Sequence, residues 1–302
     1  GGGVFRIDEL GGAVPPPDSL LFPPFTTRDD ALFLLGITGG RSLRVGKNVG
    51  NVQRQINLVD NLSVVAGTHQ LKFGIDYRVL LPVNGPRAYD QSVNFSGLTG
   101  VTGAIGGTAR SASVGSNEVV SLRFTNFSAY AQDTWKATPR LTLTYGLRWD
   151  VNPAPKGRHG KDLFVLETPV NPAALSFTPR GTPLFETTYN NFAPRVGGVY
   201  RLFQKQGRET VLRGGFGIFY DLGSGSLGNS SSTFPYGRFK NFSNVPFPLT
   251  SAQAAPVPFS VSIPASGVAY VADPNLKLPR TYQWNFAVEQ SVGSNQHSQL
   301  LM

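Results

Sequence analysis

The sequence contains no cysteine, which excludes both a disulfide framework and a thiolate metal site. It also has no long hydrophobic run. The longest apolar stretch extends from Ala31 to Ile37 and is interrupted by Gly36, whereas a transmembrane helix needs about 20 apolar residues. If this chain crosses a membrane, it must do so as a closed β-barrel, because a barrel is the other way to hydrogen-bond every backbone group in lipid.

Charged residues are scarce, at 15% of the chain, although 27 lysines and arginines against 18 acidic residues leave a net charge of +9. The basic residues are scattered, so we expect no nucleic-acid partner. The three histidines, His69, His159 and His297, lack metal-ligand spacing. No serine lies in a nucleophile elbow, and Asp162 and Glu167 lie in a predicted loop that cannot aim them at one substrate. We therefore predict no enzyme activity, no catalytic residue, no metal and no cofactor.

Glycine, proline and aromatic residues are abundant instead. There are 35 glycines and 23 prolines, and aromatic residues make up 11% of the chain. Glycine and proline are the least favourable residues in a helix interior, and so many aromatic side chains do not suit a solvated coil. The composition therefore predicts many strands joined by turns.

Apolar and polar residues alternate with a period of two, which places side chains on opposite faces of a strand. The alternation is clear over residues 70–81, 141–149 and 282–289, and weaker over 56–64, 192–202 and 212–220. It is broken over 124–136, where Asp133 falls on the face shared by Phe127 and Trp135. We count at least eight strands, the last of which only begins at His297.

The connections alternate between short and long. Short turns are predicted at 67–69, 138–140, 204–208 and 293–296, and stretches rich in Gly, Pro, Ser and Asn occupy 83–120, 151–190 and 222–279. Transmembrane barrels have tight periplasmic turns and long extracellular loops, whereas long loops are uncommon in compact soluble domains. The fold class is therefore predicted to be all-β, a partial antiparallel transmembrane β-barrel segment with long extracellular loops.

This interpretation assigns each strand residue to a face. The predicted lipid-facing residues are Leu71, Phe73, Ile75, Tyr77, Val79, Leu141, Leu143, Tyr145, Leu147, Trp284 and Phe286. The predicted lumen-facing residues are Lys72, Asp76, Arg78, Arg148, Arg195, Arg213, Gln283 and Asn285. The predicted aromatic girdle at the membrane interfaces comprises Trp135, Trp149, Tyr220 and Tyr282.

Glycines also fall mostly on the polar faces, at Gly74, Gly146, Gly197, Gly215 and Gly217. A strand glycine often marks close approach by another backbone, so one hypothesis is that these residues leave room for a plug inside the barrel. The alternative is that they only permit the strands to coil.

Two local motifs have a structural explanation. Residues 223–228 match the dinucleotide-binding pattern G-x-G-x-x-G, but the following residues, NSSSTFPYGRF, cannot form the helix that such a site needs. We therefore interpret them as a loop tip. Asp29 and Asp30 open the run DDALFLLG (29–36), and we expect them to cap a short helix.

Several runs, in order, resemble the barrel of TonB-dependent receptors, specifically the Oar-like group with a carboxypeptidase-regulatory-like domain. These runs are NLVDNLSVVAGTHQLKFGIDYR (57–78), NFSAYAQDTWKATPRLTLTYGLRWDVNPAP (126–155), YNNFAPRVGGVYRL (189–202), TVLRGGFGIFYD (210–221) and RTYQWNFAVEQSVG (280–293). The hairpin over 131–150 is the most specific part of the resemblance.

The resemblance implies a bacterial outer-membrane barrel of about 22 strands, surrounded by lipid and closed by an N-terminal plug domain. It also implies contact with TonB and energy-coupled uptake of an unidentified ligand. We expect residues 1–50 to be an unplaced N-terminal segment of loop or short helix, and residues 51–302 to be part of a barrel truncated at both ends. A plug-free, porin-like channel and a secreted or surface β-rich binding module, such as an adhesin, remain open as alternatives.

The face assignment can be tested in the intact parent protein. We expect Ile75→Arg to reduce the free energy of unfolding by about 2–4 kcal/mol, because it places a charge in the lipid-facing band near the bilayer midplane. Asp76→Asn should cost little. Denaturant unfolding in lipid vesicles measures both, and equally small effects at the two positions would contradict the assigned faces.

Overall fold

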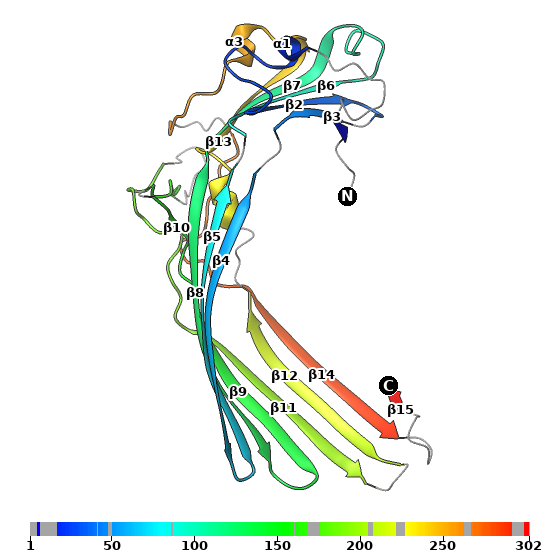
Figure 1. Cartoon of the computed structure of the whole chain (residues 1–302), viewed down its shortest axis with the longest axis vertical. Helices are drawn as coiled ribbons and strands as arrows, with labels where there is room; N and C mark the ends of the chain where they lie inside the picture. Colours follow the sequence, from blue (N-terminus) through cyan, green and yellow to red (C-terminus); the bar gives the residue numbers. More distant parts are fainter. Residues whose placement is uncertain are drawn as a thin grey trace.

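The computed structural model describes residues 5–6, 17–40, 42–47, 50–85, 87–159, 161–167, 176–204, 208–221, 227–262, 267–291 and 299–301. Nearly all of its regular structure is β, in one large sheet and one smaller sheet (Figure 1). No helix among the described residues is long and apolar enough to cross a membrane.

The large sheet is an up-and-down meander. Its strands are β4 (Val52–Ala66), β5 (His69–Asn84), β8 (Val120–Lys136), β9 (Leu141–Val151), β11 (Asn191–Phe203), β12 (Thr210–Tyr220), β14 (Arg280–Ser291) and β15 (Gln299–Leu301). Each strand pairs antiparallel with the next one in this series, and the short strand β10 (Lys156–Gly157) also pairs with β8. The predicted antiparallel sheet of eight sequential strands is therefore confirmed.

The sheet is strongly curved but it does not close on itself in the described residues. β4 and β15 form its two edges and do not pair with each other (Figure 1). Strands β4, β5 and β8 are 15, 16 and 17 residues long, whereas β9, β11, β12 and β14 have 11 to 13 residues. The three long strands therefore extend beyond the others at the long-loop end.

The short connections lie at one end of the sheet and the long ones at the other, as the sequence predicted. The first turn consists of residues 67–68, because His69 already begins β5 rather than belonging to the turn. The predicted turn at 204–208 lies partly, and the one at 293–296 entirely, outside the described residues, as does His297.

The long connections contribute to a second sheet. Its strand order is β1 (Phe5–Arg6), β3 (Leu43–Gly46), β2 (Ala31–Ile37), β6 (Tyr89–Phe95), β7 (Thr108–Asn117) and β13 (Gly237–Pro246). The first three strands come from the N-terminal segment, β6 and β7 from the connection after β5, and β13 from the connection after β12. In the part of the chain that the structure describes, the short helices α1 (Asp18–Leu21), η3 (Asn229–Ser231) and α3 (Ser251–Ala254) also lie at this end of the molecule.

The expectation that Asp29 and Asp30 cap a helix is wrong. Residues 31–37 form β2, which pairs in parallel with β6 and antiparallel with β3. Ala31, Leu32 and Phe33 are all buried, so both faces of this strand are covered. A strand that is buried on both faces has a continuous apolar run in its sequence, and periodicity cannot distinguish such a run from a buried helix.

The smaller sheet has its own apolar core, which includes Phe33, Val93 and Val114. Tyr89 lies in this core, and its hydroxyl donates to the carbonyl oxygen of Ala254 at 2.8 Å. Burial, with a contribution from Asp90, raises the pKa of Tyr89. The tyrosine therefore stays neutral and ties α3 to the sheet.

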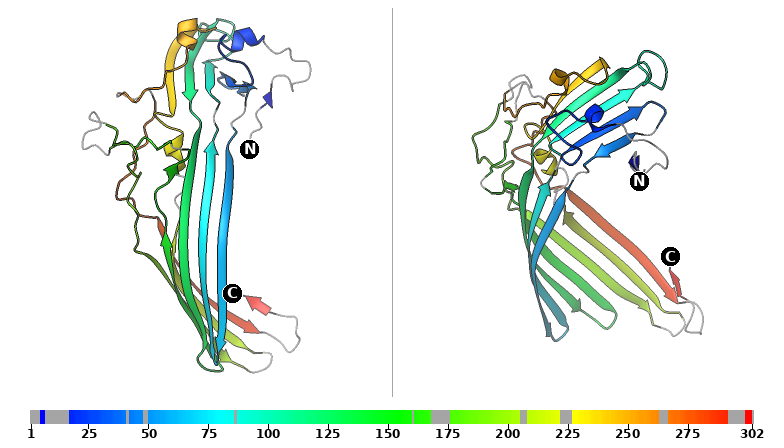
Figure 2. Two further views of the ribbon diagram at one scale, coloured as in Figure 1. Left: turned by 60° about the vertical axis from the view of Figure 1, so that its left-hand side comes forward. Right: turned by 45° about the horizontal axis from the view of Figure 1, so that its top comes forward.

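A second core joins the loops to the large sheet. Leu122 and Phe124 of β8 pack in one cluster with Leu163, Val165 and Phe185 of the connection between β9 and β11. Figure 2 shows these loops beside the upper part of β8, above the ends of the shorter strands. The extra length of β8 thus provides the surface on which the long loops fold.

Gly74 occupies a position in the large sheet where a larger side chain does not fit. A Cβ atom here would overlap the ring of Tyr130 and the side-chain oxygen of Asn61. The Tyr130 hydroxyl donates to that oxygen at 2.7 Å, directly over the glycine. At this position the space is therefore taken by neighbouring side chains of the same sheet.

We expect Gly74→Ala to lower the free energy of unfolding by about 1 kcal/mol, because the methyl group displaces Tyr130 and breaks its hydrogen bond to Asn61. Gly197→Ala is the matched control, since its nearest new contact is an ordinary 3.4 Å to the carbonyl oxygen of Gly214. Denaturant unfolding of the parent protein in lipid vesicles measures the difference, and equal effects of the two variants would rule out this role for Gly74.

Candidate functional site on the polar face of the large sheet

The strand registers divide the large sheet into two chemically distinct faces, since directly paired residues project to the same side. All the residues predicted to face lipid, and the four predicted girdle residues, lie together on one face, here called the apolar face. The eight residues predicted to face the lumen lie together on the opposite face, here called the polar face.

The apolar face is largely uncovered by the described residues. Trp284 is 79% exposed, Phe286 68% and Leu58 64%. Soluble proteins rarely expose so large a contiguous apolar surface. This face therefore requires an apolar environment outside the chain.

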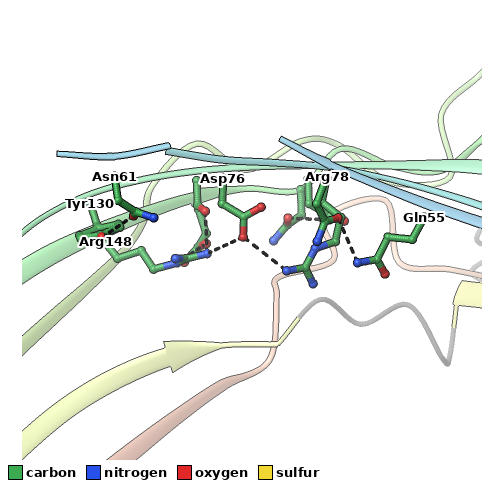
Figure 3. A network of polar contacts seen from close by, with 11 residues as sticks. Gln55, Asn61, Asp76, Arg78, Tyr130 and Arg148 are labelled. Carbon is green, nitrogen blue, oxygen red and sulfur yellow. Dashed lines mark hydrogen bonds and ion pairs between the residues drawn. The ribbon is translucent and has the colours of Figure 1, made fainter. Parts of the chain in front are cut away.

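An ion-pair cluster occupies the polar face, at the level where β5, β8 and β9 lie side by side (Figure 3). Arg78 Nη2 lies 3.3 Å from Asp76 Oδ2, and Arg148 Nη2 lies 3.9 Å from the same oxygen. Arg148 also donates from Nε to Asp150 Oδ1 at 3.0 Å and from Nη2 to Ser128 Oγ at 2.6 Å. One arginine thus joins carboxylates from two strands.

The cluster lines a hollow of about 150 Å³ that extends across the sheet to β12. Its far wall includes Arg195 of β11 and Phe219 of β12, and the Arg195 guanidinium lies 4.3 Å from the centre of the Phe219 ring. Because one hollow contacts side chains from β5 through β12, the polar face is the concave side of the curved sheet. Arg78, Arg148 and Arg195 outnumber Asp76 and Asp150, so the hollow carries a positive excess.

Several buried polar atoms of this cluster lack a partner. Asp76 Oδ1, Arg78 Nε and Asn126 Oδ1 make no hydrogen bond within the part of the chain that the structure describes. Buried polar groups are almost always hydrogen-bonded in native proteins. The two oxygens can accept hydrogen bonds and Arg78 Nε can donate one, but the cluster has no nucleophile paired with a base.

The other predicted polar-face residues lie apart from this cluster. Lys72 lines a neighbouring hollow with Tyr130, Gln132 and the same Arg148 and Arg195. Gln283 and Asn285 lie on β14 beside the glycines of β12, and Arg213 forms its own ion pair with Glu289 at 2.7 Å.

The apolar face also contains a polar cluster that the sequence analysis did not predict. Asp133 is only 6% exposed, and it accepts hydrogen bonds from His69 Nδ1 at 2.6 Å and from the Tyr145 hydroxyl at 2.8 Å. His69 also stacks on Trp135, with ring centres 5.5 Å apart. The broken alternation at Asp133 was the available signal, and the paired histidine explains how a carboxylate is accommodated on this face.

The described residues contain no group of three or more His, Cys, Asp or Glu side chains that could hold a metal ion. Residues 223–226 of the G-x-G-x-x-G segment (223–228) lie outside the described residues.

Comparison with known proteins identifies the family of the chain. A family model described as "Outer membrane beta barrel domain" matches residues 11–300. No curated protein sequence and no solved structure matches the chain. The family match spans almost the whole chain, and it agrees with an antiparallel meander that has one apolar and one polar face. The chain therefore belongs to the outer membrane beta barrel domain family and is part of a bacterial outer-membrane protein.

Proposed function

We propose that this chain forms part of the barrel of a TonB-dependent receptor that takes up a solute across the outer membrane with energy from TonB. In this proposal the apolar face contacts lipid, the polar face lines the lumen, and an N-terminal plug domain of the parent protein covers the polar face. The resemblance of five ordered segments to such receptors supports the proposal, and the polar face supports it independently.

The observation that carries the proposal is the charged hollow on the polar face, which is lined by Asp76, Arg78, Arg148, Asp150 and Arg195. Charged groups that face the interior of a barrel need water or a polar partner. A plug domain packed in the lumen would offer polar partners to this surface, and its withdrawal would expose a charged path for a polar solute.

A plug-free channel is the main competing function. It would share the lipid-facing surface and the charged lumen, but it would leave the polar face open to water. A surface binding module is a weaker alternative, because Trp284, Phe286 and Leu58 would then be exposed to water. Access of water to the polar face therefore distinguishes a plugged receptor from a plug-free channel.

Single-cysteine labelling tests this access, since the chain has no cysteine of its own. Gln283 lies on the polar face and is exposed in this sheet. We expect Gln283→Cys in the parent protein, in intact outer membranes, to react with a water-soluble polyethylene-glycol maleimide at least about tenfold more slowly than Arg110→Cys. A plug that fills the lumen would block the reagent.

Arg110 is the control because it is exposed on β7, in the smaller sheet at the long-loop end. Both variants should react fully after denaturation. Rapid labelling of Gln283→Cys in the folded protein would show an open lumen and would favour the plug-free channel.

The proposed energy coupling leads to a separate prediction. The purified parent protein should bind the isolated periplasmic domain of TonB in a pull-down from detergent, because a coupled receptor must present a contact for it. A barrel with a protected lumen that fails to bind TonB under these conditions would be plugged but uncoupled.

A further inference from the structure

The long-loop end contains a pocket that lies away from the polar-face cluster. Its volume is about 330 Å³, which is at the lower end of the range for small-molecule sites. Residues from the start of β8, from the connection after β9 and from the connection after β12 line it together. Three separate segments of the sequence therefore meet to form one cavity.

Aromatic rings form much of the pocket wall. The ring of Phe164 lies 5.9 Å from that of Tyr236 and 5.7 Å from that of Phe259, measured between centres. The backbone N–H of Phe164 donates to the Tyr236 hydroxyl at 2.9 Å, which fixes two of these residues to each other. Burial raises the pKa of Tyr236, so its hydroxyl remains protonated and can donate a hydrogen bond to a ligand.

Charged side chains surround this aromatic wall. Arg180 lies over the Phe164 ring, with its guanidinium carbon 3.9 Å from the ring centre, and Lys161 and Asp162 also line the pocket. These three residues are exposed, and none forms an ion pair within the described ranges. Their charges sum to one positive.

Glu118, the other acidic residue in the pocket lining, is already paired with an arginine. Glu118 accepts a hydrogen bond from Arg238 at 3.1 Å, and the Arg238 side chain is only 3% exposed. This buried arginine also donates to the carbonyl oxygen of Pro235 at 2.7 Å, so it is fixed in place. Glu118 therefore does not cancel the positive charge that Arg180 and Lys161 offer to a ligand.

We propose that this pocket binds a small organic monoanion with an aromatic or other flat apolar body. The rings of Phe164, Tyr236 and Phe259 would contact that body. Arg180 would bind the anionic group through its planar guanidinium, whose donors match a carboxylate. Stacking on Phe164 already orients Arg180, so less side-chain entropy is lost on binding.

Asp162 narrows the ligand class further. A second negative charge on the ligand would be repelled by this carboxylate, whereas a hydroxyl or ammonium group could donate to it. The pocket therefore favours a single negative charge. This binding function stands whether or not binding leads to uptake.

The test uses the parent protein purified in detergent, with 2-naphthoate as the probe and isothermal titration calorimetry as the measurement. We expect saturable binding of 2-naphthoate, and binding at least about tenfold weaker for 2-naphthylmethanol, which keeps the rings but lacks the charge. Arg180→Gln should weaken 2-naphthoate binding about tenfold, because it removes a charge-assisted hydrogen bond. Phe259→Ala should weaken the binding of both compounds.

Arg110→Gln is the matched control, since it removes one exposed positive charge on β7, outside the pocket. Because Arg180 and Phe259 are exposed, both pocket variants should fold, and heat-dependent mobility of the barrel in gel electrophoresis checks this. The proposal is overturned by absence of saturable binding to the unmodified protein, by equal affinity for 2-naphthylmethanol, or by equal effects of Arg180→Gln and Arg110→Gln. The assay needs neither TonB nor transport, so its failure is separate from failure of the proposed uptake function.

Discussion

In the hydrocarbon interior of a membrane, no water is available to hydrogen-bond the backbone, and each strand must therefore bond to a strand on either side. The order from β4 to β15 follows this constraint, because each strand pairs antiparallel with the next one along the meander. The same ladders hold directly opposite residues on a common face. The continuous pairing thereby produces both the curved wall and its two chemically different surfaces.

The two surfaces solve different physical problems. On the apolar face, large side chains such as Trp284 and Phe286 are suited to lipid, and the buried carboxylate of Asp133 is held by His69 and Tyr145. On the polar face, glycine and long side chains share the space, as Tyr130 does by lying over Gly74. Charge is concentrated where Arg148 joins Asp76 and Asp150.

The long connections have a structure of their own. They supply three strands of the smaller sheet, and they pack onto the upper part of β8 through Leu122 and Phe124. This packing brings Phe164, Arg180 and Tyr236 together around one pocket, although they lie far apart in the sequence. At the long-loop end, apolar burial therefore shapes a surface that can bind a ligand.

The sequence by itself determined the strand pattern of the large sheet, the alternation of short and long connections and which of the assigned strand residues share a face, because a period of two is a local property of the chain. It failed at β2, where burial on both faces removes the alternation, and it could not show that His69 pairs with Asp133. Only the tertiary structure decided how the loops fold, which arginines meet Asp76 and where a pocket forms. These features depend on contacts between distant segments, and no local periodicity in the sequence records such contacts.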